Sequence, residues 1–225
     1  MGRYEPIATE RSAVTLVIRA NAYHALTRAL DRPSAWQPDF VGTLVGAFEG
    51  FGEGLGVPAR AAADLAVAAG TDLEPVSVAH AKLFLGPFEI AAAPWATFYL
   101  DPEQRLMGPA TLYAAEAYAA AGLGPGEGPR DAADHVTQEL EFMYYLAFQE
   151  ATTGDPAWHE RQERFWNDHL GRWLPEFAEA IRRADAHPFY QSVADVLLAF
   201  CEREDALLKP GAGTTTNHDI STQRR

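Results

Sequence analysis

Apolar residues recur every three or four positions along most of the chain, which is the spacing of amphipathic α-helices. The first run starts near Thr9 and stops before Pro33. Its apolar stripe consists of Val14, Val17, Ile18, Ala22, Ala25 and Ala29. A second run has Pro38 in its first turn, where proline is favoured, and ends at Gly54 and Gly56. The pattern therefore predicts two helices at this end of the chain.

Proline and glycine divide the middle of the chain into further predicted helices. Pro58 opens a short alanine-rich helix, and residues 76–85 form another that a Gly-Pro pair ends. A helix is also predicted over residues 109–121. The stretch that follows, residues 122–129, is so rich in glycine and proline that it predicts a long loop.

The next predicted helix begins just after two aspartates. Asp131 or Asp134 is expected to cap its first turn, because a carboxylate at that position accepts hydrogen bonds from free backbone N–H groups. The inward stripe of this helix is Val136, Leu140, Met143 and Ala147. A Gly-Asp-Pro sequence at residues 154–156 is expected to interrupt it.

The remaining sequence is also helical in pattern. Helix resumes near Ala157, and Gly171 and Pro175 are expected to split or bend it. A last helix is predicted over residues 188–208. Beyond it, residues 209–225 contain little to bury and are expected to be a disordered tail.

The pattern of the whole chain favours one fold class. We find no pair of alternating strands, no heptad array and no repeated unit. The sequence therefore predicts an all-α fold, a single-domain bundle of about eight to ten helices over residues 1–208.

One irregular stretch, residues 86–108, is unusually apolar. It contains Phe88, Pro94, Trp95, Phe98, Tyr99 and Leu100. A loop that only joins two helices rarely carries so many aromatic side chains. We expect this stretch to pack against another part of the molecule.

The charge excludes some partners. The chain has 31 Asp and Glu against 18 Lys and Arg, a formal net charge of −13. Nucleic acid and anionic membrane surfaces need clustered cations, so we expect no nucleic-acid partner and no stable membrane insertion. An acidic surface attracts a basic peptide, although many proteins are acidic for solubility alone.

The single cysteine and the start of the chain bear on location. Cys201 follows an apolar stretch and has no second cysteine to pair with, which favours a buried thiol in a reducing compartment. The first ten residues do not have a basic start followed by an apolar run. We therefore expect a cytoplasmic protein.

The sequence offers little for catalysis. The glycine clusters do not match a nucleotide-binding loop, and neither Gly-x-Ser-x-Gly nor Glu-x-x-His occurs. His135 and Glu139 lie one helical turn apart, but a pair of this kind is common by chance. We expect no metal, no cofactor and no enzyme activity.

Two segments resemble the TorD/DmsD/NarJ family of redox-enzyme maturation chaperones, in particular its TorD/DmsD-like branch. The first is His80-Ala-Lys-Leu-Phe-Leu-Gly86 followed by Pro94-Trp-Ala-Thr-Phe-Tyr-Leu100. The second runs from Glu127 through Pro129 to Asp134-His135 and continues into Glu139. His80 stands where the family usually has an aromatic residue, and Pro129 is farther from Asp134 than is usual.

The resemblance implies an all-helical chaperone for a molybdenum-cofactor oxidoreductase. Such a chaperone binds the twin-arginine leader of the precursor and holds it in the cytoplasm until the cofactor is inserted. Whether the chain is a monomer or a dimer that exchanges helices stays open, as does the identity of the client.

The resemblance also suggests the leader-binding residues. Carboxylates of Asp134 and Glu139 would meet the guanidinium groups. The apolar part of the leader would lie on Leu83, Phe84, Phe88, Trp95 and Tyr99, near His80 and Pro129. Gly86 would allow a sharp turn, and His135 would orient Asp134 or donate to the peptide. Replacing Asp134 by Asn is then expected to weaken leader binding about tenfold.

Each of these residues also has an ordinary explanation. Leu83 and Phe84 fit a helical core, Asp134 fits a helix cap, and Glu139 fits a solvated face. Two other function classes also stay open. One is a helical enzyme with an unrecognised metal or cofactor, and the other is a structural assembly subunit of a reductase.

Overall fold

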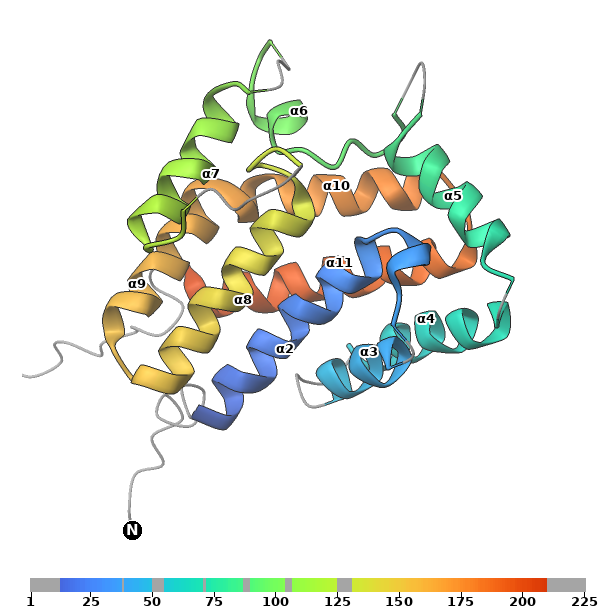
Figure 1. Cartoon of the computed structure of the whole chain (residues 1–225), viewed down its shortest axis with the longest axis horizontal. Helices are drawn as coiled ribbons and strands as arrows, with labels where there is room; N and C mark the ends of the chain where they lie inside the picture. Colours follow the sequence, from blue (N-terminus) through green and yellow to red (C-terminus); the bar gives the residue numbers. More distant parts are fainter. Residues whose placement is uncertain are drawn as a thin grey trace, which may run out of the picture.

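The computed structural model describes residues 13–37, 39–49, 55–70, 72–86, 90–103, 107–124 and 131–209. Over these residues the chain is helical and contains no strand, which confirms the all-α prediction (Figure 1). The helices are α2 (Ala13–Leu30), α3 (Phe40–Glu49), α4 (Gly56–Ala69), α5 (Glu74–Phe84), α6 (Thr97–Leu100), α7 (Pro109–Ala120), α8 (Val136–Thr153), α9 (Pro156–Phe165), α10 (Gly171–Arg183) and α11 (Pro188–Leu208). A 3-10 turn at Pro33–Ala35 follows α2, and a π-helix at Trp166–Leu170 joins α9 to α10.

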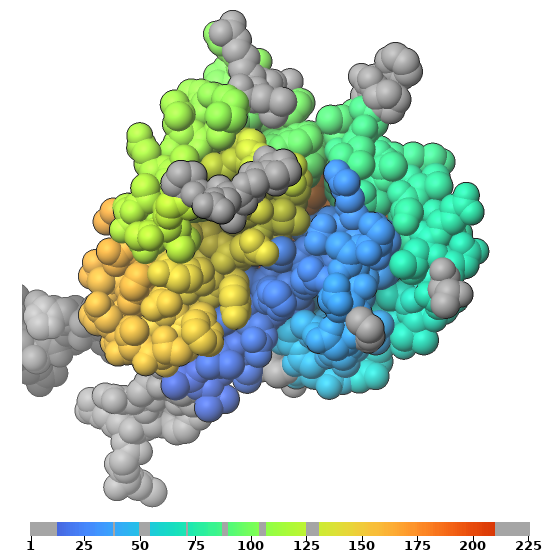
Figure 2. Space-filling model, in the orientation of Figure 1, coloured from blue at the N-terminus to red at the C-terminus, as the bar shows by residue number. Residues whose placement is uncertain are grey.

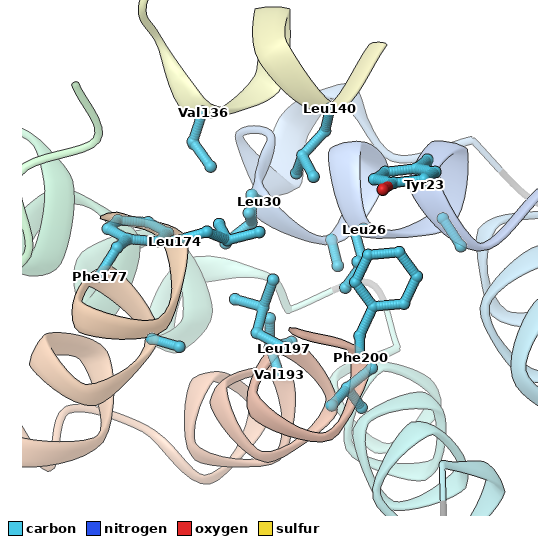
Figure 3. Close-up of a cluster of buried hydrophobic side chains, with 14 of the residues drawn as sticks. Tyr23, Leu26, Leu30, Val136, Leu140, Leu174, Phe177, Val193, Leu197 and Phe200 are labelled. Carbon is cyan, nitrogen blue, oxygen red and sulfur yellow. The ribbon is translucent and has the colours of Figure 1, made fainter. Parts of the chain in front are cut away.

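The bundle is organised around four helices that are far apart in sequence. Helices α2 and α8 lie side by side, and α10 and α11 pack together behind them (Figure 1). Their meeting point is filled by Leu26 and Leu30 of α2, Val136 and Leu140 of α8, Leu174 and Phe177 of α10, and Val193 and Leu197 of α11 (Figure 3). Helices α3 and α4 pack on each other, α3 against α2 and α4 against α11.

The observed helices follow the predicted apolar stripes closely. The stripe Val136, Leu140, Met143 and Ala147 is at most 1% exposed, because one face of α8 is pressed against α2. Removing side chains of this size from water stabilises the fold by about 1.5–3 kcal/mol each. The last helix runs from Pro188 to Leu208, as predicted.

Some predicted boundaries differ from the structure. Gly56 starts α4 and does not end the preceding helix, and Pro58 lies within the first turn of α4. Gly171 does mark the predicted division, since it is where the π-helix ends and α10 starts, whereas Pro175 lies inside α10 without ending it. The predicted starts at Thr9 and Pro38, and the predicted tail from residue 210 on, lie outside the described residues.

A buried ion pair joins α2 to α11. The Arg19 guanidinium donates to both carboxylate oxygens of Glu204, at 2.7 and 2.5 Å, and Tyr23 donates its hydroxyl proton to the same carboxylate. Arg19 also donates to Gln162 of α9, which in turn donates to Glu150 of α8 at 2.9 Å. Arg19 is 3% exposed and Glu204 is fully buried, so neither charge has water as an alternative partner.

Candidate functional site

A short backbone pairing brings the two family-like segments together. Trp95 and His135 form an isolated antiparallel bridge, in which Ala96 N–H donates to the carbonyl of Asp134 at 3.0 Å. Val136 N–H donates to the carbonyl of Pro94 at 2.8 Å. The rings of Trp95 and His135 lie 5.6 Å apart, edge to face. The aromatic stretch is therefore fixed against the start of α8.

A cleft opens beside this bridge, between the end of α2, α5, the start of α8 and α10. Figure 2 shows the surfaces of α2, α5 and α8 meeting there. The lining residues are Leu30, Asp31, Arg32, His80, Phe84, Leu85, Pro94, Trp95, Asp131, His135, Val136, Thr137 and Phe177. Its enclosed volume is about 60 Å³. This space holds a few water molecules or one inserted side chain, far less than a drug-sized ligand requires.

The apolar wall of the cleft rests on a stack of aromatic rings. Phe84 lies edge to face with His80, with ring centroids 4.9 Å apart, and packs on Phe177 at 5.8 Å. His80 is also anchored by a contact of 3.3 Å between its Nε2 and the carbonyl of Leu30. The wall is thus held by the core beneath it. On the surface beside it, Leu85 leaves 49% of its area exposed.

The polar side of the cleft carries two carboxylates and one guanidinium. Asp31 is half-buried and lies 3.7 Å from Arg28, while Asp131 is exposed. Arg32, also exposed, supplies the positive charge. Burial lowers the pKa of His135, and the nearby Asp131 and Asp31 carboxylates oppose that shift. Burial likewise lowers the pKa of His80. With both imidazoles neutral at pH 7, the lining has a net charge of about −1.

Asp134 does not line the cleft, so the structure gives no support to the prediction that its carboxylate meets a ligand guanidinium. Its side chain is fully buried. One carboxylate oxygen accepts from the backbone N–H of Thr97 at 3.1 Å, and the other accepts from the Thr111 hydroxyl at 2.9 Å. Asp134 therefore joins the α6 and α7 segments to α8. It does not cap α8 either: His135 does, accepting from Thr137 N–H at 3.3 Å.

Glu139 is also directed away from the cleft, so its predicted contact with a leader arginine is not supported. The carboxylate is fully buried on another face of α8. It accepts hydrogen bonds from His169 at 2.7 Å and from Trp173 at 3.0 Å. Burial raises the pKa of Glu139 to about 6, with the His169 and Trp173 hydrogen bonds acting in the opposite direction. Its place is structural, and the solvated-face alternative is equally wrong.

The other predicted residues are divided between cleft and core. His80, Phe84, Trp95 and His135 line the cleft. Leu83 is fully buried in the core, and Tyr99 stacks on Trp173 with centroids 5.5 Å apart, so neither lines the cleft. Gly86 follows α5 at the end of the described segment and is not part of the lining. Phe88 and Pro129 lie outside the described residues.

The cleft carboxylates were not predicted as ligand-binding residues. Asp31 follows the last residue of α2, and Asp131 lies in the segment before α8. The sequence around each of them indicates only an ordinary loop or helix-capping aspartate. Only in the folded chain do both carboxylates lie near the imidazole ring of His135.

No three His, Cys, Asp or Glu side chains gather into a metal-binding group within the part of the chain that the structure describes. Among the same residues, no helix is both long enough and apolar enough to cross a bilayer.

Comparison with known proteins assigns the family. A family model described as "Nitrate reductase delta subunit" matches residues 49–179, more than half of the chain. The chain belongs to this family. The matched region of the nitrate reductase delta subunit family includes α5, the Trp95–His135 bridge and most of α10, but not Asp31. The resemblance seen in the sequence is thereby confirmed.

Individual relatives agree with this assignment. Chaperone protein TorD of Vibrio parahaemolyticus is 30% identical over 131 residues, which cover 56% of this chain and 61% of that protein. Tat proofreading chaperone DmsD of Salmonella typhi is 27% identical over 123 residues, 55% of this chain and 57% of that protein. The chain thus spans about three-fifths of the length of these curated relatives.

A solved structure shares the fold. It is a provisionally named redox enzyme maturation protein of Archaeoglobus fulgidus, with a TM-score of 0.53 and 20% sequence identity. The superposition covers 81% of this chain and 93% of that one. At this identity the match supports the helical architecture alone.

Proposed function

We propose that this protein is a cytoplasmic maturation chaperone that binds the twin-arginine leader of a molybdenum-cofactor oxidoreductase. The single observation that carries the proposal is the composition of the cleft at the Trp95–His135 bridge. One side is aromatic, and the other holds Asp31, Asp131 and Arg32, so that carboxylates outnumber the one guanidinium. A leader with two arginines and an apolar stretch is complementary to both sides.

The names of the relatives support this proposal. One is a chaperone protein TorD and the other a Tat proofreading chaperone DmsD. Neither name describes a catalyst. We therefore propose a binding function without catalysis.

The size of the cleft limits how a leader would bind. One apolar side chain placed in the enclosed space contributes about 1.5–3 kcal/mol. Each ion pair with Asp31 or Asp131 is open to solvent and contributes up to about 1 kcal/mol. Micromolar affinity requires about 8 kcal/mol, so the leader must also contact the surface beside the cleft. Leu85, which lines the cleft and is 49% exposed, offers apolar surface for such a contact.

Calorimetric titration with a synthetic peptide tests the proposal. The peptide carries two adjacent arginines followed by an apolar stretch, and its control carries two glutamines in their place. We expect the double variant Asp31→Asn/Asp131→Asn to bind the arginine peptide about tenfold more weakly, equivalent to about 1.4 kcal/mol. Trp95→Ala should also weaken binding, through the apolar wall.

The matched control is Asp195→Asn/Glu202→Gln on α11, where both carboxylates are exposed and neither lines the cleft. It removes two negative charges, as the cleft variant does, without altering the cleft, so its affinity should equal that of the wild type. Equal binding of the arginine and glutamine peptides would reject a twin-arginine ligand. An equal loss of affinity in the two double variants would show that net charge alone attracts the peptide.

A second candidate is favoured by the description of the family as a reductase subunit. In that case the chain stays attached to the mature enzyme. Affinity purification of the tagged chain distinguishes the two: a chaperone recovers precursor that still carries its leader, and a permanent subunit recovers processed, cofactor-loaded enzyme.

A further inference from the structure

A second and larger cavity lies between α7, α8 and α9, away from the leader cleft. Its enclosed volume is about 280 Å³. None of its lining residues belongs to the cleft beside Trp95. The function proposed above makes no use of this cavity.

The floor of the cavity is aromatic and rigidly packed. Phe142 and Phe165 are at most 4% exposed and lie edge to face, with ring centroids 4.9 Å apart. Tyr113 lies nearly parallel to Phe165 at 6.2 Å and stacks on the buried His169 at 4.9 Å. These contacts hold the rings in place, so the floor needs little rearrangement on binding.

Small side chains keep the space above this floor open. Ala117 and Ala120 of α7 face Ala157 of α9 across the cavity. Larger side chains at these two positions of α7 would fill the gap. The room left by these alanines is just below the range of about 300–1,000 Å³ found for drug-sized ligands. It matches one bulky side chain better than a cofactor.

The rim of the cavity is cationic on a strongly acidic protein. Arg161 and Arg164 of α9 line it, together with the single carboxylate of Glu160. Arg161 lies 4.9 Å from the Trp158 ring and donates to the carbonyl of Ala157 at 3.0 Å. Neither arginine forms an ion pair within the described part of the chain. The rim thus carries a net charge of about +1 where the whole chain carries −13.

We propose that this cavity is a docking site for an acidic segment of a partner protein. An aromatic side chain of that segment enters the space above Phe142 and Phe165, and neighbouring carboxylates meet the guanidinium groups of Arg161 and Arg164. The ligand is opposite in charge to the basic leader, so the two sites bind different segments. This inference is independent of the leader-binding proposal.

The probe for this site is a dye-labelled peptide, Asp-Glu-Phe-Asp-Glu, with capped ends. Fluorescence anisotropy is measured in about 0.15 M salt, where charges farther than about 8 Å are largely screened and the acidity of the rest of the protein matters little. We expect Arg161→Glu/Arg164→Glu to weaken probe binding tenfold or more. Ala120→Trp, which places a large side chain in the cavity from an exposed position, should weaken it similarly.

Matched controls separate the site from general charge effects. Arg172→Glu/Arg203→Glu makes the same charge change at exposed positions outside the cavity and should leave probe affinity within twofold. A peptide with Ala in place of Phe should bind at least tenfold more weakly. Binding of the twin-arginine peptide should be unchanged in Ala120→Trp.

Three results would overturn the proposal: no binding of the acidic probe, equal loss in the two charge-reversal variants, or full binding by Ala120→Trp. A competition measurement with phenylacetate tests one further alternative. If it displaces the probe at the probe's own dissociation constant, the cavity is a small-molecule site and not a protein-docking site.

Discussion

The carboxylate of Glu139 lies 2.7 Å from Nε2 of His169, thirty positions later in the chain, and neither side chain is more than 2% exposed. The Trp173 indole completes the group from the next turn, at 3.0 Å. This contact fixes α8 to the π-helix that precedes α10. It also gives the fold a buried group that titrates near neutral pH.

The pH dependence of stability should carry the signature of Glu139. Burial raises the pKa of Glu139 to about 6 from its ordinary value of 4.5. Between these two values the folded state holds a proton that the unfolded chain has released. The contribution of this carboxyl to stability therefore falls as the pH rises through the window, by about 2 kcal/mol, and is constant above it.

Urea unfolding of the wild type and Glu139→Gln at several pH values between 4 and 8 measures this effect. The difference in free energy of unfolding, wild type minus variant, should fall between pH 4.5 and 6. A difference that is the same at every pH would show that Glu139 titrates normally.

Asp134 should behave as a structural residue. Asp134→Ala leaves the Thr97 N–H and the Thr111 hydroxyl without their acceptor, which should lower the free energy of unfolding by about 2–4 kcal/mol. Asp134→Asn keeps one acceptor oxygen and should cost less. In conditions where the Asn variant is folded, its affinity for the arginine peptide should stay within twofold of the wild type, contrary to the tenfold loss expected from sequence. A tenfold loss in a folded Asn variant would return Asp134 to the binding site.

Leader binding should weaken in mild acid through His135. Burial lowers the pKa of this imidazole, so it is neutral at pH 7, and its protonation places a positive charge beside Asp31 and Asp131. Peptide affinity should be constant from pH 8 to about 6.5, the ordinary pKa of an imidazole, and fall at lower pH. His135→Asn keeps an acceptor for the Thr137 N–H and cannot titrate, so its affinity should change less over the same range. Parallel pH profiles for the two proteins would exclude His135.

Gly171 should not tolerate a methyl group. A Cβ added there would lie 2.7–2.9 Å from atoms of Trp166, a fully buried residue whose indole donates to Asp205 at 2.8 Å. Gly171→Ala should therefore lower stability by about 1–3 kcal/mol, although alanine favours helix. Gly46→Ala on α3 meets nothing within 4 Å and should stabilise by up to about 1 kcal/mol. Thermal unfolding of both variants checks the contrast.

The helices were predictable because their apolar stripes are local. Val136, Leu140 and Met143 face the core as their spacing indicates, and Pro188 starts α11 as proline in a first turn should. The family resemblance assigned Trp95 and His135 to one set of leader-binding residues, and their rings lie 5.6 Å apart. Periodicity alone carries no information on a contact between residues forty positions apart.

The roles of the carboxylates were not predictable, because their partners are distant in sequence. Asp134 precedes a helix, which locally indicates a cap, but Thr97 and Thr111 take both of its oxygens. Glu139 has polar neighbours on α8, yet His169 and Trp173 arrive from another helix to cover it. Asp31 and Asp131 were not predicted as binding residues, because they are far apart in sequence and meet only in the folded chain. Nothing near them in sequence shows that they share a cleft.

The contact between Arg19 and Glu204 spans 185 residues, so it closes only after nearly all of the described chain has been synthesised. Until α11 leaves the ribosome, Arg19 of α2 lacks its carboxylate partner, although α8 is already there to cover the apolar face of α2. Helix α2 thus cannot settle into its final environment during translation, and completion of the bundle should be a late, post-translational event with a slow kinetic phase. In destabilised variants, newly made chains should therefore aggregate first. Loss of protein that has already folded should come later.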